Sequence, residues 1–387
     1  MTITAIRSDA RALVPALADR AEEAEQLRRL PDETIADYER SGLGRLLMPA
    51  RYGGEQAEFG AILELIRELA HGCTASAWTL GFYTLHNWML SLFGEQAQEE
   101  VFGAGRPVRA PAPLAPTGRG IPADGGLRLT GRWSWATGIM HAEWVLVGAL
   151  VGPDDRIVPA LVLLGADEVR VEDTWQTEGM RATGSADVTV DDVFVPAHRI
   201  VAIPDIYAGT APGATLHDAA LYRWPMVPAL ALSAAMPALG TAERVAELYA
   251  GRLHDRVLAD GSGKQRDKSA AQARLAEAEV RLAACRALVG ATAREVQGLL
   301  DDGERPRRLH RARARLAAAH TVAESRRVIA LLLEASGGSA HFLSSPLQRA
   351  KRDVDTLAGH VIFDYDTSRE LAGALAIGLL ISPTAMV

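Results

Sequence analysis

Cysteine is scarce in this chain of 387 residues, which contains only Cys73 and Cys285. Two cysteines so far apart provide neither a disulfide framework nor the paired thiolates of a zinc site. Each lies beside or within an apolar pattern of helical spacing, where a free cysteine behaves as a small hydrophobic side chain. We therefore expect both cysteines to be buried between helices.

An excess of positive charge is also lacking, because 48 acidic residues outnumber 41 basic ones and the net charge is −7. A general nucleic-acid binder needs a basic face that neutralises phosphates, so this class is excluded. Residues 305–315 form the one basic stretch, with Arg308, Arg311 and Arg315 on one helical stripe. The overall charge favours a solvated or subunit-facing helix surface there.

Long apolar segments suited to a membrane are missing as well. Residues 1–26 mix acidic and basic side chains and therefore do not resemble a signal peptide. Residues 371–387 are apolar but short for a bilayer, and Pro383 interrupts them, which favours a buried final helix. These features predict a soluble, cytoplasmic protein without a membrane partner.

The motifs of common cofactor and metal sites do not occur in the chain. Residues 103–108 and 118–123 lack the third glycine of a dinucleotide fingerprint, and neither segment opens a helix. Residues 261–265 lack the upstream glycine and the hydroxyl residue of a phosphate-binding loop. No HExxH, no GxSxG and no metal-spaced cluster of His and Cys is present. Neither a nicotinamide site nor a metal site is therefore predicted.

What the chain does contain is a helical pattern over residues 1–107, which predicts an N-terminal helical domain. Apolar residues recur at helical spacing in residues 31–47 and 57–70, and a Pro and a Gly pair place a loop at 48–55. Residues 74–93 are apolar nearly all round, which predicts a helix that is buried on several sides.

Residues 108–213 change to a period of two, which predicts a β domain. On one face of the first strand lie Leu127, Leu129, Trp133 and Trp135. Turn residues separate it from further expected strands at 144–151, 156–164 and 168–175. No helical segment lies between the strands, so we expect an antiparallel barrel or sandwich and exclude a doubly wound sheet.

Residues 214–387 are helical again and predict a C-terminal bundle. Long amphipathic patterns cover residues 266–300, 307–338 and 345–380, with short connections between them. The predicted fold class is therefore mainly α with a central β domain.

One expected strand begins with small and hydroxyl residues and ends at a proline, in the sequence TEGMRATGSADVTVDDVFVPAHR. Its alternation predicts that Val188 and Val190 face inward. The pair Asp191-Asp192 interrupts the alternation as a β-bulge would. We expect Pro196 to end the strand and release the chain toward the bundle.

Four stretches in this order and setting, MPARYGG, GRWSWATG, GMRATGSADVTVDDVFVPAHR and GGSAHFLSSPLQRAKRD, make the chain resemble the acyl-CoA dehydrogenase superfamily. The resemblance covers nearly the whole chain. It implies an N-terminal helical domain, an antiparallel β domain and a C-terminal four-helix bundle. It also implies a flavin bound between the β domain and the bundle, and assembly as a homotetramer.

The branch of this superfamily depends on the catalytic base. In many acyl-CoA dehydrogenases a glutamate follows the Arg-Asp pair of the bundle, whereas here Arg352-Asp353 is followed by no glutamate before Glu370. His360 stands at the corresponding place, as in the two-component (group D) flavin-dependent monooxygenases, which the chain resembles more. Two alternatives remain: a dehydrogenase or oxidase with an atypically placed base, and a flavin-free relative that acts as a binding or assembly protein.

The resemblance assigns six site residues. Those with catalytic roles are His360 and His86, and those that would bind the flavin are Trp78, Thr137, Trp175 and Arg256. Threonine at position 137 is a departure, since serine is commoner there, and the match of Arg256 to a phosphate-binding arginine is loose.

The implied reaction uses reduced flavin from a separate reductase, with FMN expected rather than FAD, together with O2. A C4a-hydroperoxide would oxygenate a small aromatic, polyketide or amine substrate. Thr137, on a rigid strand end, would bond to the flavin N5 position. A histidine, His360 or His86, would remove the substrate's proton. Arg256 would offer a fixed cation to a flavin phosphate.

The glycines and hydroxyl residues before the bulged strand then suggest a wall beside the flavin. Gly179 and Gly184 would let the backbone pass close to the ring, and Thr183 and Ser185 would offer hydrogen-bond donors. A purely structural strand remains the alternative.

Taken from the residues alone, each site residue also has a structural interpretation. Lone histidines such as His86 and His360 on apolar helices are commonly satisfied core residues. Trp133 and Trp135 fit a buried stripe, and Thr137 fits the cap of a turn. Only the resemblance favours the functional interpretation over these.

Overall fold

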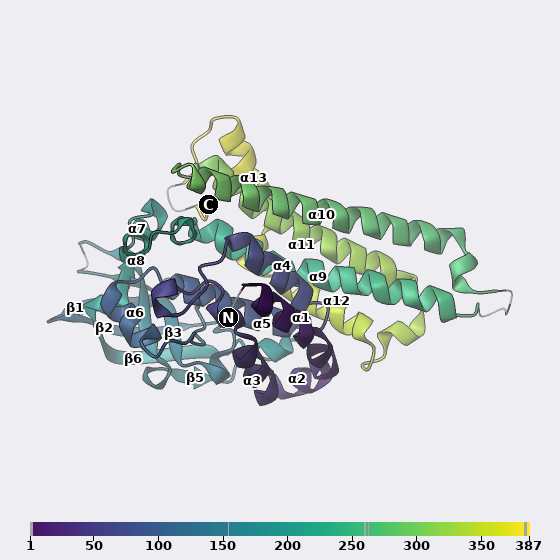
Figure 1. Cartoon of the computed structure of the whole chain (residues 1–387), viewed down its shortest axis with the longest axis horizontal. Coiled ribbons are helices and arrows are strands. Elements are labelled where there is room, and N and C mark those ends of the chain that lie inside the picture. The colour runs from purple at the N-terminus through teal and green to yellow at the C-terminus, as the bar shows by residue number, and fades with distance from the viewer. Residues whose placement is uncertain (1–2, 154, 259–260, 262, 383–384) are drawn as a thin grey trace.

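The computed structural model describes residues 3–153, 155–258, 261, 263–382 and 385–387. Helices, a β-sheet and a second set of helices follow one another along the chain. In Figure 1 the sheet forms one end of the molecule and the long C-terminal helices extend away from it, with the N-terminal helices packed against both. The predicted fold class is confirmed.

The N-terminal helices surround α5, which is the central helix of this part. Every residue of α5 except Phe82 is buried, as expected for a helix that is apolar on all sides. The polar side chains of α5 therefore point into the protein interior or into a cleft. The helices are α1 (Ile3–Asp19), α2 (Ala21–Leu27), α3 (Asp32–Ser41), α4 (Phe59–Leu69), α5 (Thr74–Leu90) and α6 (Glu95–Phe102).

The strands form one sheet in the order β5-β6-β2-β1-β3-β4-β7. Neighbouring strands are antiparallel except β1 and β3, which pair in parallel, so the expectation of a wholly antiparallel domain was wrong at this pair. The strands are β1 (Gly118–Ala123), β2 (Gly126–Trp133), β3 (Trp144–Val151), β4 (Val158–Gly165), β5 (Arg170–Glu172), β6 (Asp187–Pro196) and β7 (Ile200–Ala202).

Strand β1 was not predicted because it contains two glycines and a proline, which usually indicate loops. Gly118 has a packing reason to be there. A Cβ atom at this position would lie 2.2 Å from the ring of Trp133 on β2. Strand β1 can therefore pair with β2 here only because residue 118 has no side chain.

Strand β6 contains the predicted bulge. Asp191 and Asp192 together lie opposite Thr130 of β2, and Asp192 has a left-handed backbone with φ of 51°. Before the bulge Val188 and Val190 are buried, as predicted.

Pro196 ends β6, but the prediction that it releases the chain toward the bundle was wrong. A short turn at Ala197–Arg199 leads straight into β7, which pairs antiparallel with β4. The chain reaches the bundle only after the short helices α7 (Ile203–Ala208) and α8 (Pro212–Leu216). A proline at a strand end is compatible with either course.

The C-terminal helices pack around α9, with α11 beside it (Figure 1). Among the described helices, α9 alone is long and apolar enough to cross a membrane, but 94% of its apolar window is buried inside the protein. Such burial is that of a central core helix. The helices are α9 (Met226–Asp255), α10 (Ser269–Asp301), α11 (Arg308–Glu334), α12 (Pro346–Ala358) and α13 (Tyr365–Ala376). Cys73 and Cys285 are free and buried, as predicted.

The arginine stripe of α11 does not form the solvated or subunit-facing surface that was predicted. Arg315 is 3% exposed and donates hydrogen bonds to the carbonyl oxygens of Val361 at 3.1 Å and Ile362 at 3.2 Å. Arg308 donates to the carbonyl of Ser382 at 2.6 Å. Arg315 therefore fixes the turn that follows α12, and Arg308 fixes the segment that follows α13. Multiple donors on one rigid group suit that task.

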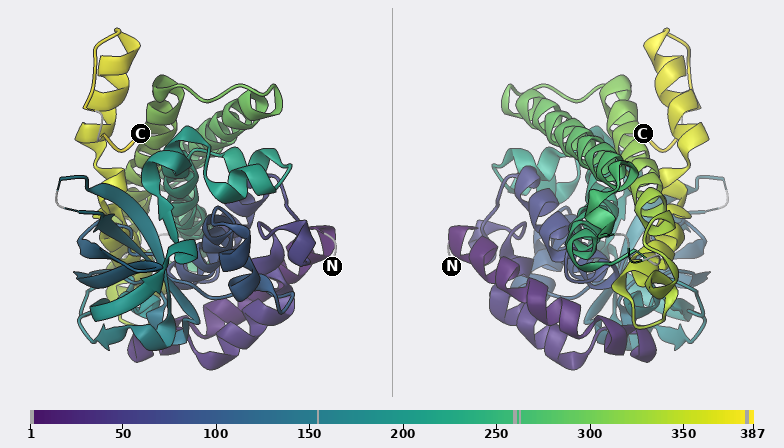
Figure 2. Two further views of the ribbon diagram at one scale, coloured as in Figure 1. Left: turned by 90° about the vertical axis from the view of Figure 1, so that its left-hand side faces the viewer. Right: turned by 90° about the vertical axis from the view of Figure 1, so that its right-hand side faces the viewer.

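The prediction of a buried final helix was also wrong. Helix α13 ends at Ala376 and projects from the body of the protein, as the yellow arm of Figure 2 shows. After it, Ile377 and Leu380 are 76% and 98% exposed, while Pro383 lies outside the described residues. The arm therefore carries an apolar surface that the rest of the chain leaves uncovered.

Candidate active site

Four of the six predicted site residues meet at one place. Helix α5 supplies Trp78 and His86, the segment after β2 supplies Thr137, and the turn after α12 supplies His360. The rings of Trp78 and His360 are 6.0 Å apart between centroids, and Trp78 Nε1 donates to Thr137 Oγ1 at 3.3 Å. The fold thus brings together residues from each of its three parts.

The two histidines lie at the two ends of a row of aromatic rings. Centroid distances are 6.0 Å from His360 to Trp78, 4.6 Å from Trp78 to Phe82 and 5.3 Å from Phe82 to His86. Phe82 is the one residue of α5 that is not buried, and His360 is exposed, so the row reaches the protein surface at these two side chains, a place that we call the opening. An apolar wall with a polar group at each end suits the recognition of a flat aromatic molecule.

The loop after β2 holds Thr137 in a fixed position. Tyr83 of α5 donates from its hydroxyl group to the carbonyl oxygen of Gly138 at 2.5 Å, and Gly138 N donates to Thr183 O at 2.8 Å. Gly138 has a φ of 77°, and a Cβ atom here would lie 2.3 Å from the Tyr83 hydroxyl oxygen. Glycine is therefore required directly after Thr137.

Thr137 is the first member of a line of hydroxyl groups that leads away from the opening. Its Oγ1 lies 2.9 Å from Ser185 Oγ, which lies 2.7 Å from Thr183 Oγ1. Thr183 then donates to the carbonyl oxygen of Met180 at 2.9 Å. The same carbonyl accepts from Trp175 Nε1 at 3.0 Å, so Trp175 is connected to Thr137 through this line.

Thr183 and Ser185 do not form a wall that faces the opening, because their side chains are only 2% and 4% exposed. Gly179 likewise serves packing, since a Cβ atom there would lie 2.1 Å from the carbonyl oxygen of Arg352 on α12. The segment therefore supports Thr137 from behind, which differs from the role that the sequence suggested.

Asp353 of α12 anchors the far end of this hydroxyl line. Its Oδ1 accepts from Met180 N at 2.6 Å, and Met180 has a left-handed backbone with φ of 54°. Burial raises the pKa of Asp353 to about 6, although the bond from Met180 opposes the change. The carboxyl group is 5% exposed and is engaged by the loop, so it is not a base that reaches the opening.

Replacing Asp353 with asparagine is expected to change the free energy of unfolding, relative to the unchanged protein, by an amount that becomes more favourable as the pH rises. A raised folded-state pKa means that Asp353 contributes stability at low pH, which is lost as the pH rises through about 6. Two pKa units correspond to about 3 kcal/mol. Between about pH 4 and 7 the unfolding free energy of Asp353→Asn, measured in urea, should rise by about this amount relative to the unchanged protein.

Asp355 on the same helix provides the matched control. Burial raises the pKa of Asp355, but hydrogen bonds from Lys351 and Arg326 outweigh it and lower the pKa. Asp355→Asn should therefore show the opposite trend: its loss of stability develops as the pH rises toward about 4 and stays constant above that, so its difference from the unchanged protein should not rise between about pH 4 and 7. A pH-independent difference for Asp353→Asn would contradict the assigned cost of burying that charge.

His86 carries a hydrogen-bond acceptor at the buried end of the aromatic row. Its Nδ1 lies 2.6 Å from the carbonyl oxygen of Ala110, and because a carbonyl only accepts, the proton must be on Nδ1. The lone pair is therefore on Nε2. Burial lowers the pKa of His86 to about 4, so the ring is neutral near pH 7.

His360 has the opposite arrangement. Its Nδ1 accepts a hydrogen bond from Ile362 N at 3.2 Å, which places the proton on Nε2 and makes that atom a donor. The side chain keeps an exposed face, while the protein around its other sides, followed by the charge of Arg315, lowers the pKa of His360. Arg315 also fixes the turn through the carbonyls of Val361 and Ile362.

Arg256 is not brought to this place. It follows the end of α9, where it donates to Gln265 at 3.2 Å and to the carbonyl oxygen of Ala335 at 3.3 Å. Thr241 of α9 contacts Thr74 at the start of α5, and fifteen further helical residues correspond to ~22 Å. The arginine lines a separate hollow of about 360 Å³ at the end of the bundle.

Trp135 is a candidate site residue, although its place on the apolar stripe of the strand predicted a core position. Its side chain is 64% exposed and its φ is 69°, an uncommon conformation for a bulky residue. It lies two residues before Thr137, whose backbone N–H donates to the Trp135 carbonyl at 2.9 Å. The left-handed turn that breaks the alternation after Trp133 was not readable from the strand pattern.

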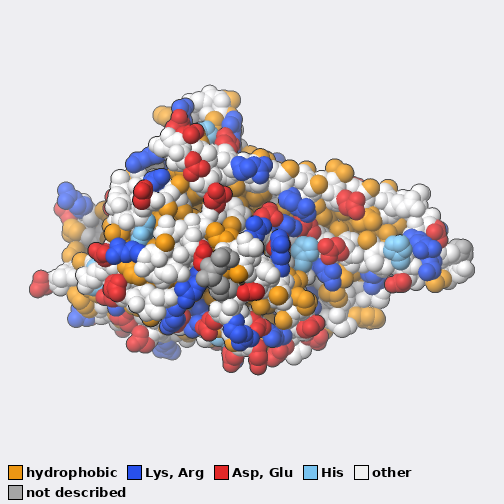
Figure 3. All heavy atoms as spheres, viewed as in Figure 1, with side chains coloured by type: hydrophobic (Ala, Val, Ile, Leu, Met, Phe, Trp, Pro, Cys, Tyr) orange, Lys and Arg blue, Asp and Glu red, His pale blue; other side chains and the backbone are white. Residues whose placement is uncertain are grey.

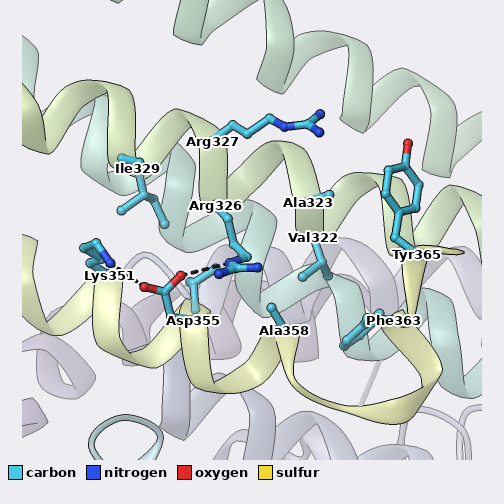
Figure 4. Close-up of a pocket in the computed structure, with 13 residues that line it drawn as sticks. Val322, Ala323, Arg326, Arg327, Ile329, Lys351, Asp355, Ala358, Phe363 and Tyr365 are labelled. Atoms are coloured by element: carbon cyan, nitrogen blue, oxygen red, sulfur yellow. Dashed lines mark hydrogen bonds and ion pairs between the residues drawn. The ribbon is translucent and has the colours of Figure 1, made fainter.

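A second hollow lies on the flank of the bundle between α11 and α12 (Figure 4). It has a volume of about 460 Å³, and in it Asp355 contacts both Arg326 and Lys351. None of the six predicted site residues lines it. Its carboxylate is paired with two cations and is not available as a base.

The chemistry of the converging residues suits a flavin rather than a metal ion. Within the described part of the chain, no group of three His, Cys, Asp or Glu side chains could hold a metal ion. An exposed indole, a row of rings, a hydroxyl oxygen and two neutral imidazoles instead match a flat ring system with a polar edge.

Comparison with protein families gives two matches. Residues 2–103 match the acyl-CoA dehydrogenase N-terminal domain, and residues 232–365 match the acyl-CoA dehydrogenase C-terminal domain. The two matched regions hold α5 with Trp78 and His86, and α12 with the His360 turn.

Individual relatives extend the likeness over the whole chain. The oxygenase subunit HsaA of a flavin-dependent monooxygenase from Rhodococcus jostii is 35% identical over 376 residues, which cover 96% of this chain and 98% of that protein. The oxygenase component of an FADH2-dependent resorcinol hydroxylase from a Rhizobium species is 31% identical, over 93% of this chain and 90% of that one. The crystal structure of HsaA from M. tuberculosis superimposes with a TM-score of 0.94 over all of both chains, at 32% identity.

Proposed function

The chain belongs to the acyl-CoA dehydrogenase family and, within it, to the flavin-dependent monooxygenases, and we propose that it hydroxylates a small aromatic substrate at the aromatic row of α5. The observation that carries the proposal is the convergence of Trp78, Thr137, His86 and His360 on one opening. Resorcinol, in the name of one relative, is an aromatic compound with hydroxyl groups.

A reduced flavin bound here supplies the electrons that activate O2 for insertion into the substrate. Trp135 offers the exposed indole against which a flavin ring can lie. Thr137 offers a hydroxyl oxygen that the surrounding loop holds in place. Both FMN and FAD fit these contacts, and our prediction remains FMN.

The two histidines have complementary tasks in this proposal. Nε2 of His86 accepts the hydrogen of a substrate hydroxyl group, which increases electron density on the aromatic ring. Nε2–H of His360 donates to an oxygen atom that becomes negatively charged during transfer. This assignment gives the base function, which the sequence left open between the two histidines, to His86 and a donor role to His360.

The position of Arg256 supports a homotetramer. Within one chain it is far from Thr137 along α9, so a flavin whose phosphate binds Arg256, as the resemblance implies, would be held by another copy. Exposed apolar residues support such contacts: Val280 on α10 is 70% exposed, and the tail after α13 carries Leu380. Figure 3 shows hydrophobic side chains along the exposed length of the long helices.

The proposal includes a separate flavin reductase, because no nicotinamide-binding motif occurs in the sequence. Diffusible reduced flavin must then pass from the reductase to the opening beside α5. Both proteins act in the cytoplasm in this scheme, and O2 is the second substrate.

The decisive experiment supplies the purified protein with a flavin reductase, NADH, FMN or FAD, a panel of phenols and oxygen-18 gas. The expected product is a hydroxylated phenol that contains one labelled oxygen atom, with the second atom in water. Mass spectrometry of the product provides the measurement.

A different outcome would favour the alternatives. Loss of the colour of bound oxidised flavin on addition of an acyl-CoA, without labelled product, would indicate a dehydrogenase. Absence of any flavin binding would indicate a binding or assembly protein.

A further inference from the structure

The hydroxyl line behind Thr137 has a direction that follows from counting protons. Each hydroxyl group carries one hydrogen atom to donate and can accept as well. The line ends at the carbonyl oxygen of Met180, which can only accept. Thr183 must therefore donate its one hydrogen to this oxygen, at 2.9 Å. Ser185 must then donate to Thr183, at 2.7 Å, and Thr137 must donate to Ser185, at 2.9 Å.

The reverse direction is unfavourable. If Thr137 turned its hydrogen toward the opening, Ser185 would donate to Thr137 and Thr183 would donate to Ser185. Thr183 Oγ1 would then face the Met180 carbonyl at 2.9 Å with lone pair against lone pair. Thr183 and Ser185 are 2% and 4% exposed, and a buried polar group without a hydrogen costs more than an exposed one.

Thr137 is consequently an acceptor toward the opening. Its hydrogen is committed to Ser185, and one lone pair receives the N–H of Trp78 at 3.3 Å. The position that remains on its oxygen is a lone pair. The backbone N–H of Thr137 adds no donor, because it is bonded to the carbonyl of Trp135 at 2.9 Å.

We propose that Ser185 and Thr183 are positioning residues, and that the direction they impose on the hydroxyl group of Thr137 determines how strongly the site prefers reduced over oxidised flavin. The N5 atom of a reduced flavin carries a hydrogen and can donate to Thr137. The N5 atom of an oxidised flavin carries only a lone pair, which faces the lone pair of Thr137. The inference rests on the proposed flavin site, and it assigns Ser185 and Thr183 as positioning residues that set the polarity of Thr137.

Selectivity of this kind suits a protein that receives reduced flavin from elsewhere and must release the oxidised form after each turnover. Specificity here comes from a mismatch against the wrong redox form as well as from a bond to the right one.

The test is the ratio of the dissociation constants of oxidised and reduced flavin, titrated without oxygen into the purified protein and followed by ultrafiltration. Ser185→Ala removes the acceptor of the Thr137 hydrogen, which can then turn to the opening. Oxidised flavin should bind about fivefold more tightly to this variant, the worth of one neutral hydrogen bond, with reduced flavin little changed.

Thr183→Val gives an independent check, because it keeps both Thr137 and Ser185. Ser185 loses its acceptor, donates to Thr137 instead and frees the same hydrogen. The ratio of the two dissociation constants should fall by the same factor. In the double variant Ser185→Ala/Thr183→Val the ratio should fall no further, since only one hydrogen is released.

Thr177→Val is the matched control. Thr177 donates to the carbonyl of Gly179 at 2.8 Å in the same segment but is no part of the line, so its loss should leave the ratio unchanged. Melting temperatures of all variants confirm that each is folded.

The outcomes separate this inference from the function. Equal affinity of the unchanged protein for both flavin forms, or an unchanged ratio in both Ser185→Ala and Thr183→Val, would overturn the directed line and leave the monooxygenase proposal standing. Absence of binding of either flavin form would remove the proposed flavin site itself.

Discussion

Replacing His360 with alanine is expected to reduce the formation of hydroxylated product about a hundredfold, the usual cost of removing one donor that stabilises developing charge. The donor is Nε2–H, because Nδ1 accepts from Ile362 N at 3.2 Å. Binding of reduced flavin should change little, since Thr137 and Trp135 supply other contacts. Product is measured by chromatography and flavin binding by ultrafiltration.

Two further variants test which ring nitrogen matters. Glutamine places its amide N–H near the position of Nε2, whereas asparagine places it near Nδ1. His360→Gln should therefore retain more product formation than His360→Asn. Equal rates for these two, or an unchanged rate for His360→Ala, would contradict the donor role.

The periodic parts of the fold could be predicted from the sequence because local packing determines them. The all-round apolar pattern of residues 74–93 predicted a buried helix, and α5 is one. The break at Asp191-Asp192 predicted a bulge that the register of β6 confirms. In both cases the residues report their own surroundings, since a helix or strand face that is apolar must be covered.

Features that depend on distant segments could not be predicted. The strand at Gly118 was not predicted, and this glycine makes room for Trp133 in the neighbouring strand. Arg315 was expected at a surface, but it binds carbonyl oxygens at the turn after α12. A single sequence shows which residue is small or charged and not which distant backbone approaches it.

The candidate site shows the same division. Only the resemblance to a family suggested that His86 and His360 belong to one site, since nothing in their spacing places them together. Which nitrogen of each ring carries the proton depends on Ala110 and Ile362, and only the folded arrangement supplies these partners. Their opposite tautomers are what divide acceptor from donor.

Replacing Thr137 with alanine is expected to uncouple flavin oxidation from hydroxylation. The variant loses the hydroxyl oxygen that accepts at the flavin and also the acceptor of the Trp78 N–H at 3.3 Å. Product per NADH consumed should fall about tenfold, because losing one hydrogen bond and leaving the Trp78 N–H without its acceptor costs on the order of 1–2 kcal/mol. The missing oxidising equivalents should appear as hydrogen peroxide, measured with peroxidase beside the product.

Thr137→Ser is the control, because it keeps the oxygen and loses only a methyl group. It should restore coupling, whereas Thr137→Val, which keeps the shape and loses the oxygen, should behave like Thr137→Ala. If Thr137→Ser leaked peroxide and Thr137→Val did not, the methyl group would matter rather than the oxygen, and Thr137 would have a packing role. The oxygen of Thr137 also begins the hydroxyl line through Ser185, so Ser185→Ala, which leaves that oxygen in place, should leak less peroxide than Thr137→Ala.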